Sequence, residues 1–186
     1  YFPKVNNRYL PLEKIDDYLK NVNKPFCLII ASDYPHGPFP KTDNYSKADI
    51  FKLPYDPNYV GNHKPGYYQN IQDDNDQLGK VLEMVDKYGH KESSMFIYAS
   101  DHGLSGKWSL KEQGLRLPFV VRWPGKIMPN TTSETLLTLV DVLPTILEVS
   151  KTKIPRELDG KSFVVSLKGD DKQINEYIYG VATRQN

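Results

Sequence analysis

The sequence has little of three things: cysteine, long apolar stretches and an excess of charge of one sign. Its one cysteine, Cys27, excludes an internal disulfide framework and a zinc site made of cysteines alone. No apolar stretch approaches the length of a membrane-spanning helix. The 24 Lys and Arg residues nearly cancel the 23 Asp and Glu residues, which leaves a formal charge of +1. No broad basic field therefore exists to attract nucleic acid or a membrane, and an anionic ligand needs a local site.

What the sequence does contain is an alternation of apolar runs and helical patterns. Runs that are apolar throughout are typical of strands buried on both faces, so we predict that Cys27 is buried and unmodified. The alternation predicts an α/β fold with a mostly parallel sheet flanked by helices. The expected strands cover residues 26–31, 95–99, 118–123 and 177–181, and the expected helices cover residues 12–19, 67–88 and 136–149.

The longest expected helix, residues 67–88, carries apolar residues at helical spacing. Ile71, Leu78, Leu82 and Val85 fall on one stripe, which predicts the face that packs on the core. The neighbouring carboxylates Asp73 and Asp74 cannot easily bind one ion together, because adjacent residues on a helix diverge by about 100°. Both are expected to face solvent.

Polar residues that could bind a ligand or take part in catalysis follow two of the expected strands. His36 comes after the first strand, and Asp101 and His102 come directly after the second. Because ligands bind beyond the carboxyl ends of parallel strands, we expect these three residues at one edge of the sheet. Lys107, which follows Asp101 after a short turn, is expected to join them there. A carboxylate and an imidazole in one turn can hold a divalent cation. The alternative is that Asp101 caps the turn and His102 packs against it.

His36 is flanked by Pro35 and Pro38, so its backbone is rigid and its imidazole is aimed. Such an imidazole can donate to an anion or protonate a leaving group, although an ordinary surface histidine is the alternative. Lys107 follows Gly106 and can bring an ammonium group to an anion, or can simply be solvated.

Five segments, in this order, resemble the sulfatase family of the alkaline-phosphatase-like superfamily. The first two end in the loop that holds His36 and in the turn that holds Asp101, and the third runs from the lysine through Arg-x-Pro to Trp-Pro-Gly. The last two resemble the Val-Asp-x-x-Pro-Thr helix and the Leu-x-Gly-x-Ser-Leu stretch of the family. The segments are FCLIIASDYPHGPF (26–39), MFIYASDHG (95–103), GKWSLKEQGLRLPFVVRWPG (106–125), TLVDVLPTIL (138–147) and LDGKSFVVSL (158–167).

The resemblance implies a role for each candidate residue. Asp101 and His102 would be ligands of a divalent cation, usually calcium, with magnesium as the other possibility. His36 would contact the sulfate and protonate the leaving oxygen, and Lys107 would neutralise a sulfate oxygen. Arg116, at the Arg-x-Pro position, would form a structural ion pair.

The resemblance also implies a part that this sequence does not contain. Sulfatases convert the Cys or Ser of a Cys/Ser-x-Pro-x-Arg motif to formylglycine, and Cys27 is followed by Leu28-Ile29-Ile30 instead. We therefore expect residues 1–186 to be the C-terminal portion of a sulfatase catalytic domain, with the nucleophile upstream. Alone, the chain is expected to be inactive.

Two other functions remain open from the sequence. Phosphonate monoester hydrolases and phosphodiesterases of the same superfamily share the Asp-His pair, and a non-catalytic module could bind a partner or a sulfated glycan. The Tyr-rich segment at residues 41–66 favours a carbohydrate sulfate among small-molecule and glycan sulfate esters, because tyrosine stacks on sugar rings. Export from the cytoplasm is suggested by the resemblance alone, and the oligomeric state is not readable.

Overall fold

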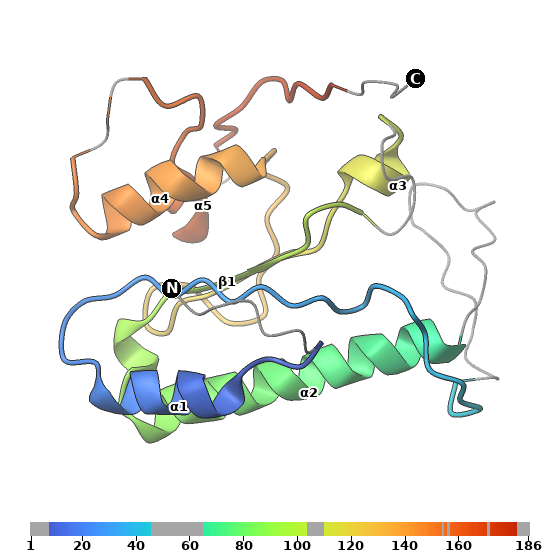
Figure 1. The fold of residues 1–186 in the computed structure, drawn as a ribbon. Coiled ribbons are helices and arrows are strands. Elements are labelled where there is room, and N and C mark those ends of the chain that lie inside the picture. The colour runs from blue at the N-terminus through green and yellow to red at the C-terminus, as the bar shows by residue number, and fades with distance from the viewer. Residues whose placement is uncertain are drawn as a thin grey trace. The chain divides into compact units, whose positions relative to one another are not determined.

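The computed structural model describes residues 8–45, 65–103, 110–153, 155, 157–170 and 172–181. The chain divides into two compact units, residues 1–91 and residues 92–186, and each is described by itself. The first unit holds α1 and α2, and the second holds the two strands and the shorter helices (Figure 1). The elements are α1 (Leu12–Asn21), α2 (Pro65–Lys87), η1 (Lys91–Ser93, across the division), β1 (Phe96–Ala99), α3 (Glu112–Leu115), β2 (Phe119–Arg122), η2 (Leu139–Asp141), α4 (Val142–Val149) and α5 (Val164–Leu167).

The first unit is built on the packing of α1 along α2, which Figure 1 shows in blue and green. Ile15 and Leu19 of α1 are almost fully buried, as are Val81 and Val85 of α2. The pairs are four residues apart, so each forms one apolar stripe on its helix. At the edge of this contact the Tyr88 hydroxyl donates to Asp16, 2.9 Å from each carboxylate oxygen.

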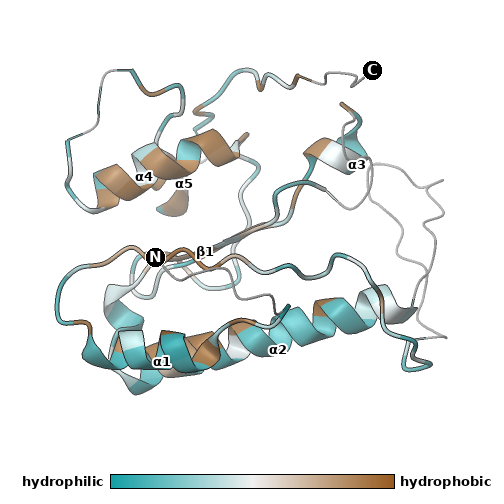
Figure 2. Ribbon diagram, in the orientation of Figure 1, coloured by the Kyte–Doolittle hydropathy of each residue, from teal (hydrophilic) through white to brown (hydrophobic). Residues whose placement is uncertain are grey.

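The buried stripe of α2 differs from the predicted one. Ile71 is 42% exposed, whereas Asn70, Asp74 and Gln77 are buried together with Val81. Asp74 accepts a hydrogen bond from the Ser32 hydroxyl at 2.5 Å, so the expectation that it faces solvent was wrong. The N-terminal half of α2 therefore buries polar groups and its C-terminal half buries apolar ones, and Figure 2 shows the helix as largely hydrophilic.

The run from Phe26 to Ala31 does not form a strand pair with any other described segment. Cys27 is exposed and Ile29 is 85% exposed, so the prediction that Cys27 is buried was wrong. A strand is covered on both faces only when neighbouring strands and helices supply the cover. Within the described residues this segment lacks strand neighbours, and its apolar side chains stay accessible.

The strands of the second unit confirm the strand predictions at residues 95–99 and 118–123 and the α/β class. β1 and β2 pair antiparallel, with Phe96 opposite Arg122 and Ala99 opposite Phe119. The predicted sheet was mostly parallel, and this pair, which is the whole sheet in the described ranges, runs the other way. Residues 177–181 form no strand.

The core of the second unit is formed by two buried polar residues and an aromatic ring. The Asp141 carboxylate accepts hydrogen bonds from the backbone N–H of Thr138 and of Lys161 and from the Asn175 amide, at 2.8–2.9 Å. The Thr145 hydroxyl accepts from the backbone N–H of Phe163, whose ring is fully buried. The Val-Asp-x-x-Pro-Thr segment therefore fixes the chain that follows it through the hydrogen bonds of Asp141 and Thr145.

Candidate active site

The loop after the Phe26–Ala31 run presents His36 at the surface. The backbone N–H of His36 donates to the Asp33 carbonyl at 3.0 Å, which closes a turn. The ring nitrogen Nδ1 of His36 lies 2.8 Å from the Gly37 carbonyl oxygen. Because a carbonyl can only accept, Nδ1 carries the hydrogen and Nε2 is the nitrogen that takes up or releases a proton. The geometry thus gives His36 one defined tautomer.

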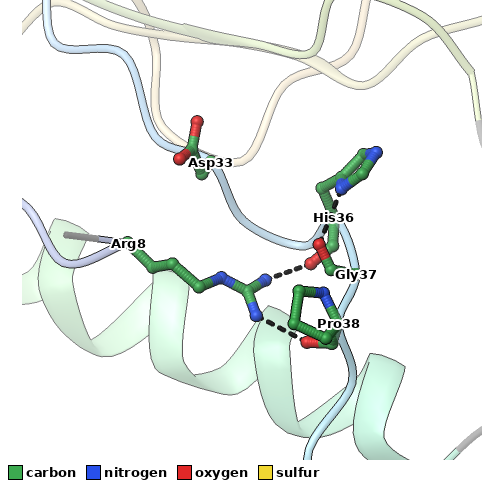
Figure 3. Close-up of a pocket in the computed structure, with 5 residues that line it drawn as sticks. All are labelled: Arg8, Asp33, His36, Gly37 and Pro38. Atoms are coloured by element: carbon green, nitrogen blue, oxygen red, sulfur yellow. Dashed lines mark hydrogen bonds between the residues drawn. The ribbon is translucent and has the colours of Figure 1, made fainter. Parts of the chain in front are cut away.

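A pocket of about 390 Å³ lies beside this loop and is lined by Arg8, Asp33, His36, Gly37 and Pro38. Figure 3 shows the Arg8 side chain reaching to the loop backbone, while the His36 ring points away from Arg8. The Arg8 guanidinium donates to the carbonyl oxygens of His36 and Pro38. The pocket is therefore lined by the guanidinium of Arg8, the carboxylate of Asp33 and the imidazole of His36.

Tyr34 of the same loop contacts Arg8. The Arg8 guanidinium lies over the Tyr34 ring, 4.8 Å from its centre, in a cation–π contact. Burial, followed by a hydrogen bond with Tyr9, raises the pKa of the Tyr34 phenol to about 12. The phenol is neutral at physiological pH, so Tyr34 supports Arg8 and does not act as a base.

Asp101 and His102 form the second candidate group, in the turn after β1. Oδ1 of Asp101 lies 3.8 Å from Nε2 of His102, and the two side chains are 83% and 37% exposed. Nδ1 of His102 lies 2.8 Å from the Gly103 carbonyl oxygen, so Nδ1 carries the hydrogen and Nε2 has its lone pair available. Metal-binding histidines commonly donate their second ring nitrogen to a backbone carbonyl in this way.

The turn that holds Asp101 and His102 is held within the second unit by nearby groups. The Ser100 hydroxyl donates to the His102 carbonyl at 2.8 Å, and the Gly103 N–H donates to the Gly114 carbonyl of α3 at 2.8 Å. Gly103 is buried, and a Cβ there would lie 2.5 Å from the Arg116 carbonyl oxygen. Only glycine fits this contact without a shift of the backbone.

The donors of this turn fit a divalent cation in kind but not in number. An exposed carboxylate and an available imidazole nitrogen are both ligands of such ions. Within the described ranges, no group of three His, Cys, Asp or Glu side chains lies close enough to form a complete site. Asp101 and His102 therefore supply at most two of the six to eight ligands that calcium takes.

The remaining predicted residues have different outcomes. Lys107 lies outside the described residues. Arg116 is 3.8 Å from the Glu112 carboxylate on α3, an exposed pair that agrees with the expected structural ion pair. The structure brings Asp101 and His102 together, whereas His36 belongs to the other unit. The predicted convergence of these three residues with Lys107 therefore stays a prediction.

Sequence reasoning missed Arg8, Asn70 and Asp74, which hold the His36 loop. Asn70 and Asp74 share the helix spacing of the buried residues Val81 and Val85, so the period of the buried face was readable. A buried face made of polar residues gives no apolar periodicity, so the apolar pattern of the sequence did not reveal it. Arg8 lies in a short segment before α1 and left no periodic signal.

Comparison with known proteins finds a matching family model. The family model for sulfatases matches residues 10–152. A solved structure from a study of glycosaminoglycan metabolism by Bacteroides thetaiotaomicron superposes with a TM-score of 0.67, at 26% identity, over 91% of this chain and 40% of that chain. The class defined by these matches is the alkaline-phosphatase-like superfamily.

Sequence relatives define the family within that superfamily. An ulvan-active sulfatase of Formosa agariphila is 45% identical over 98% of this chain and 37% of its own length. An endo-4-O-sulfatase of Bacteroides thetaiotaomicron is 29% identical over 81% of this chain and 35% of its own length. The chain therefore belongs to the sulfatase family, and it spans little more than a third of the length of these relatives.

None of the described helices combines the length and the apolar character that crossing a membrane requires.

Proposed function

We propose that the whole protein hydrolyses sulfate esters of a carbohydrate, and that this chain supplies its leaving-group acid and part of its cation site. The observation that carries the proposal is the 45% identity, over nearly the full chain, to an ulvan-active sulfatase. The endo-4-O-sulfatase supports the same class of reaction. The geometry of His36 and of the Asp101–His102 turn is suited to the two roles.

His36 is proposed as the general acid. When the S–O bond to the leaving group breaks, its electron pair goes to the departing alkoxide oxygen, and the proton on Nε2 of imidazolium His36 is transferred to that oxygen. The Nδ1–H bond to the Gly37 carbonyl keeps Nε2 as the transferring nitrogen in each cycle. The His36 side chain is exposed and lies at the pocket, where an ester could reach it.

Asp101 and His102 are proposed ligands of a divalent cation, with calcium expected and magnesium as the alternative. A bound cation polarises the sulfuryl oxygens and offsets the negative charge that builds up on them. The further ligands, and a formylglycine nucleophile, are proposed to lie outside this chain, which contains no Cys/Ser-x-Pro-x-Arg sequence. Lys107 is proposed to neutralise a sulfate oxygen.

The test is an assay of sulfate release by the full-length protein, with sulfated polysaccharide and with 4-nitrophenyl sulfate. A phosphonate monoester and a phosphodiester serve as comparison substrates, because members of the superfamily hydrolyse those as well. Preferred turnover of the sulfate esters, abolished by a chelator and restored by calcium, supports the proposal. Preferred turnover of the phosphonate or of the phosphodiester would contradict it.

A further inference from the structure

The His36 loop is short of hydrogen-bond donors of its own. Pro35, Pro38 and Pro40 have no backbone N–H, so the loop has few backbone donors for its own carbonyl groups beyond the turn that His36 closes with Asp33. The carbonyls of Pro35, His36 and Pro38 instead accept hydrogen bonds from side chains that lie far away in the sequence.

Asn70 of α2 supplies the first of these bonds. Its amide Nδ2 donates to the His36 carbonyl at 3.0 Å and to the Pro35 carbonyl at 3.3 Å. The Asn70 residue is only 1% exposed. Asparagine is a weak helix former, and its amide is costly to bury without partners. Its place on the buried face of α2 is explained by the two carbonyls it holds.

Arg8 supplies the second set, from the segment before α1. Its guanidinium donates to the His36 and Pro38 carbonyls, and Figure 3 shows both bonds. The planar guanidinium can reach two carbonyls at once, which a lysine ammonium cannot do with the same geometry. The Tyr34 ring beneath the guanidinium limits its movement. The His36 carbonyl thus accepts from two side chains that belong to different elements.

These bonds bear directly on the tautomer of His36. The carbonyl that accepts from Nδ1 belongs to Gly37, which has no Cβ to restrict its φ. The flanking carbonyls of His36 and Pro38 are the ones that Arg8 holds, and Asn70 holds the first of them as well. With both neighbours fixed, the Gly37 carbonyl stays aimed at Nδ1.

We infer that Asn70 and Arg8 are positioning residues for His36. By binding the carbonyls of His36 and Pro38 they fix the Gly37 carbonyl between them, and this carbonyl determines which ring nitrogen of His36 carries the hydrogen. The effect that we expect on catalysis rests on the proposed function. The effect that we expect on the tautomer of His36 does not. Neither residue is proposed to touch the substrate. Their effect is to keep Nε2 of His36 as the nitrogen that donates the proton to the leaving oxygen.

The structural consequence is tested in the full-length protein labelled with ¹⁵N-histidine. The chain contains four histidines, and the His36 signal is assigned from its loss in His36→Ala. The ¹⁵N shifts, followed over a series of pH values, report which nitrogen carries the hydrogen in the neutral form of the ring. We expect the Nδ1–H form in the wild type and a mixture of forms in Asn70→Leu and Arg8→Met. Arg8→Lys, which keeps the charge, should change the mixture less.

The matched control is Thr145→Val, which removes a buried hydrogen-bonding group from the other unit. This variant should be less stable but should keep the His36 tautomer. If Asn70→Leu does not fold, Arg8→Met carries the same test, because Arg8 is partly exposed. Retention of the Nδ1–H form in the variants that fold would overturn the inference. The same change of tautomer in Thr145→Val would overturn it as well.

The catalytic consequence is read from kcat/KM with two sulfate esters. With a poor alkoxide leaving group, Asn70→Leu and Arg8→Met should lose about tenfold more activity than with an activated phenol, because only the alkoxide needs the proton. If the tautomer changes while both esters lose activity equally, the positioning role stands. The proposed role of His36 as the acid would then fail, so the two failures are distinguishable.

Discussion

The two histidine sites of this chain use the same ring geometry but are held in place by different means. In both His36 and His102, Nδ1 lies 2.8 Å from the carbonyl of the next residue, which is a glycine in each case. The His102 turn is held by Ser100 and by Gly114, 2 and 12 residues away from His102. The His36 loop is held by Arg8 and Asn70, 28 and 34 residues away from His36.

The difference shows that the presence of a sequence motif does not by itself fix the geometry of its functional side chain. The Ser-Asp-His-Gly turn is held by its own Ser100 and by Gly114 of α3, so what shapes it lies within a short stretch of the sequence. The Pro-His-Gly-Pro sequence limits the backbone, but the carbonyls of His36 and Pro38 accept from distant side chains, and its shape depends on them. A match to the second motif is therefore weaker evidence for a working site than a match to the first.

The largest effect is expected from Asp101→Asn in the full-length protein. Loss of the carboxylate charge should lower sulfate release by about a hundredfold or more, and bound calcium should fall with it. Steady-state assays and metal analysis measure both quantities. Asp17→Asn, which changes an exposed carboxylate on α1, is the control and should leave both unchanged. Wild-type turnover by Asp101→Asn would remove Asp101 from the cation site.

The next largest effect is expected from His36→Ala. An ester with a poor leaving group should lose about a hundredfold in kcat/KM, while an activated phenyl sulfate loses far less, because general acid catalysis matters only for the former. His90→Ala is the matched control, since His90 lies in the same unit and its Nε2 is 2.8 Å from the Leu19 carbonyl oxygen. Equal losses for the two esters would leave His36 as a binding residue.

A moderate effect on stability is expected from Gly103→Ala. The new Cβ meets backbone carbonyls of Gln113 and Arg116 and should destabilise the protein by about 2 kcal/mol. Gly79→Ala is the control on α2, where nothing lies within 4 Å of the added Cβ. It should stabilise by about 0.5–1 kcal/mol, because alanine favours a helix. Urea unfolding measures both, and equal stabilities would show that the His102 turn does not depend on α3.

The smallest effect is expected from Tyr88→Phe, a contact between α1 and α2 away from both sites. The Tyr88 hydroxyl, followed by Lys87, lowers the pKa of Asp16 below its ordinary value of 3.8. A lowered folded-state pKa stabilises the fold above pH 3.8, and this contribution is lost as the pH falls through the lower folded value. The stability difference between wild type and Tyr88→Phe should therefore shrink below pH 3.8. A difference that is constant from pH 7 to about pH 2 would exclude Asp16 as its source.

The sequence by itself determined the family, the order of the motifs and most of the regular elements. The strands at Phe96–Ala99 and Phe119–Arg122 and the helices around residues 12–21 and 65–87 were predictable, because period and local propensity are encoded in neighbouring residues. The proximity of Asp101 and His102 was predictable for the same reason, since one turn contains both.

Only the tertiary structure decided the exposure of Cys27, the antiparallel pairing of β1 with β2 and the burial of Asn70 and Asp74. Each of these features depends on which distant segment covers the residue or pairs with it. An apolar run or a helical period in the sequence does not identify that segment. The hydrogen bonds from Arg8 and Asn70 to the His36 carbonyl are likewise a feature that only the tertiary structure decided. A carbonyl that lacks a local donor must find one elsewhere, and the folded chain alone determines which side chain that is.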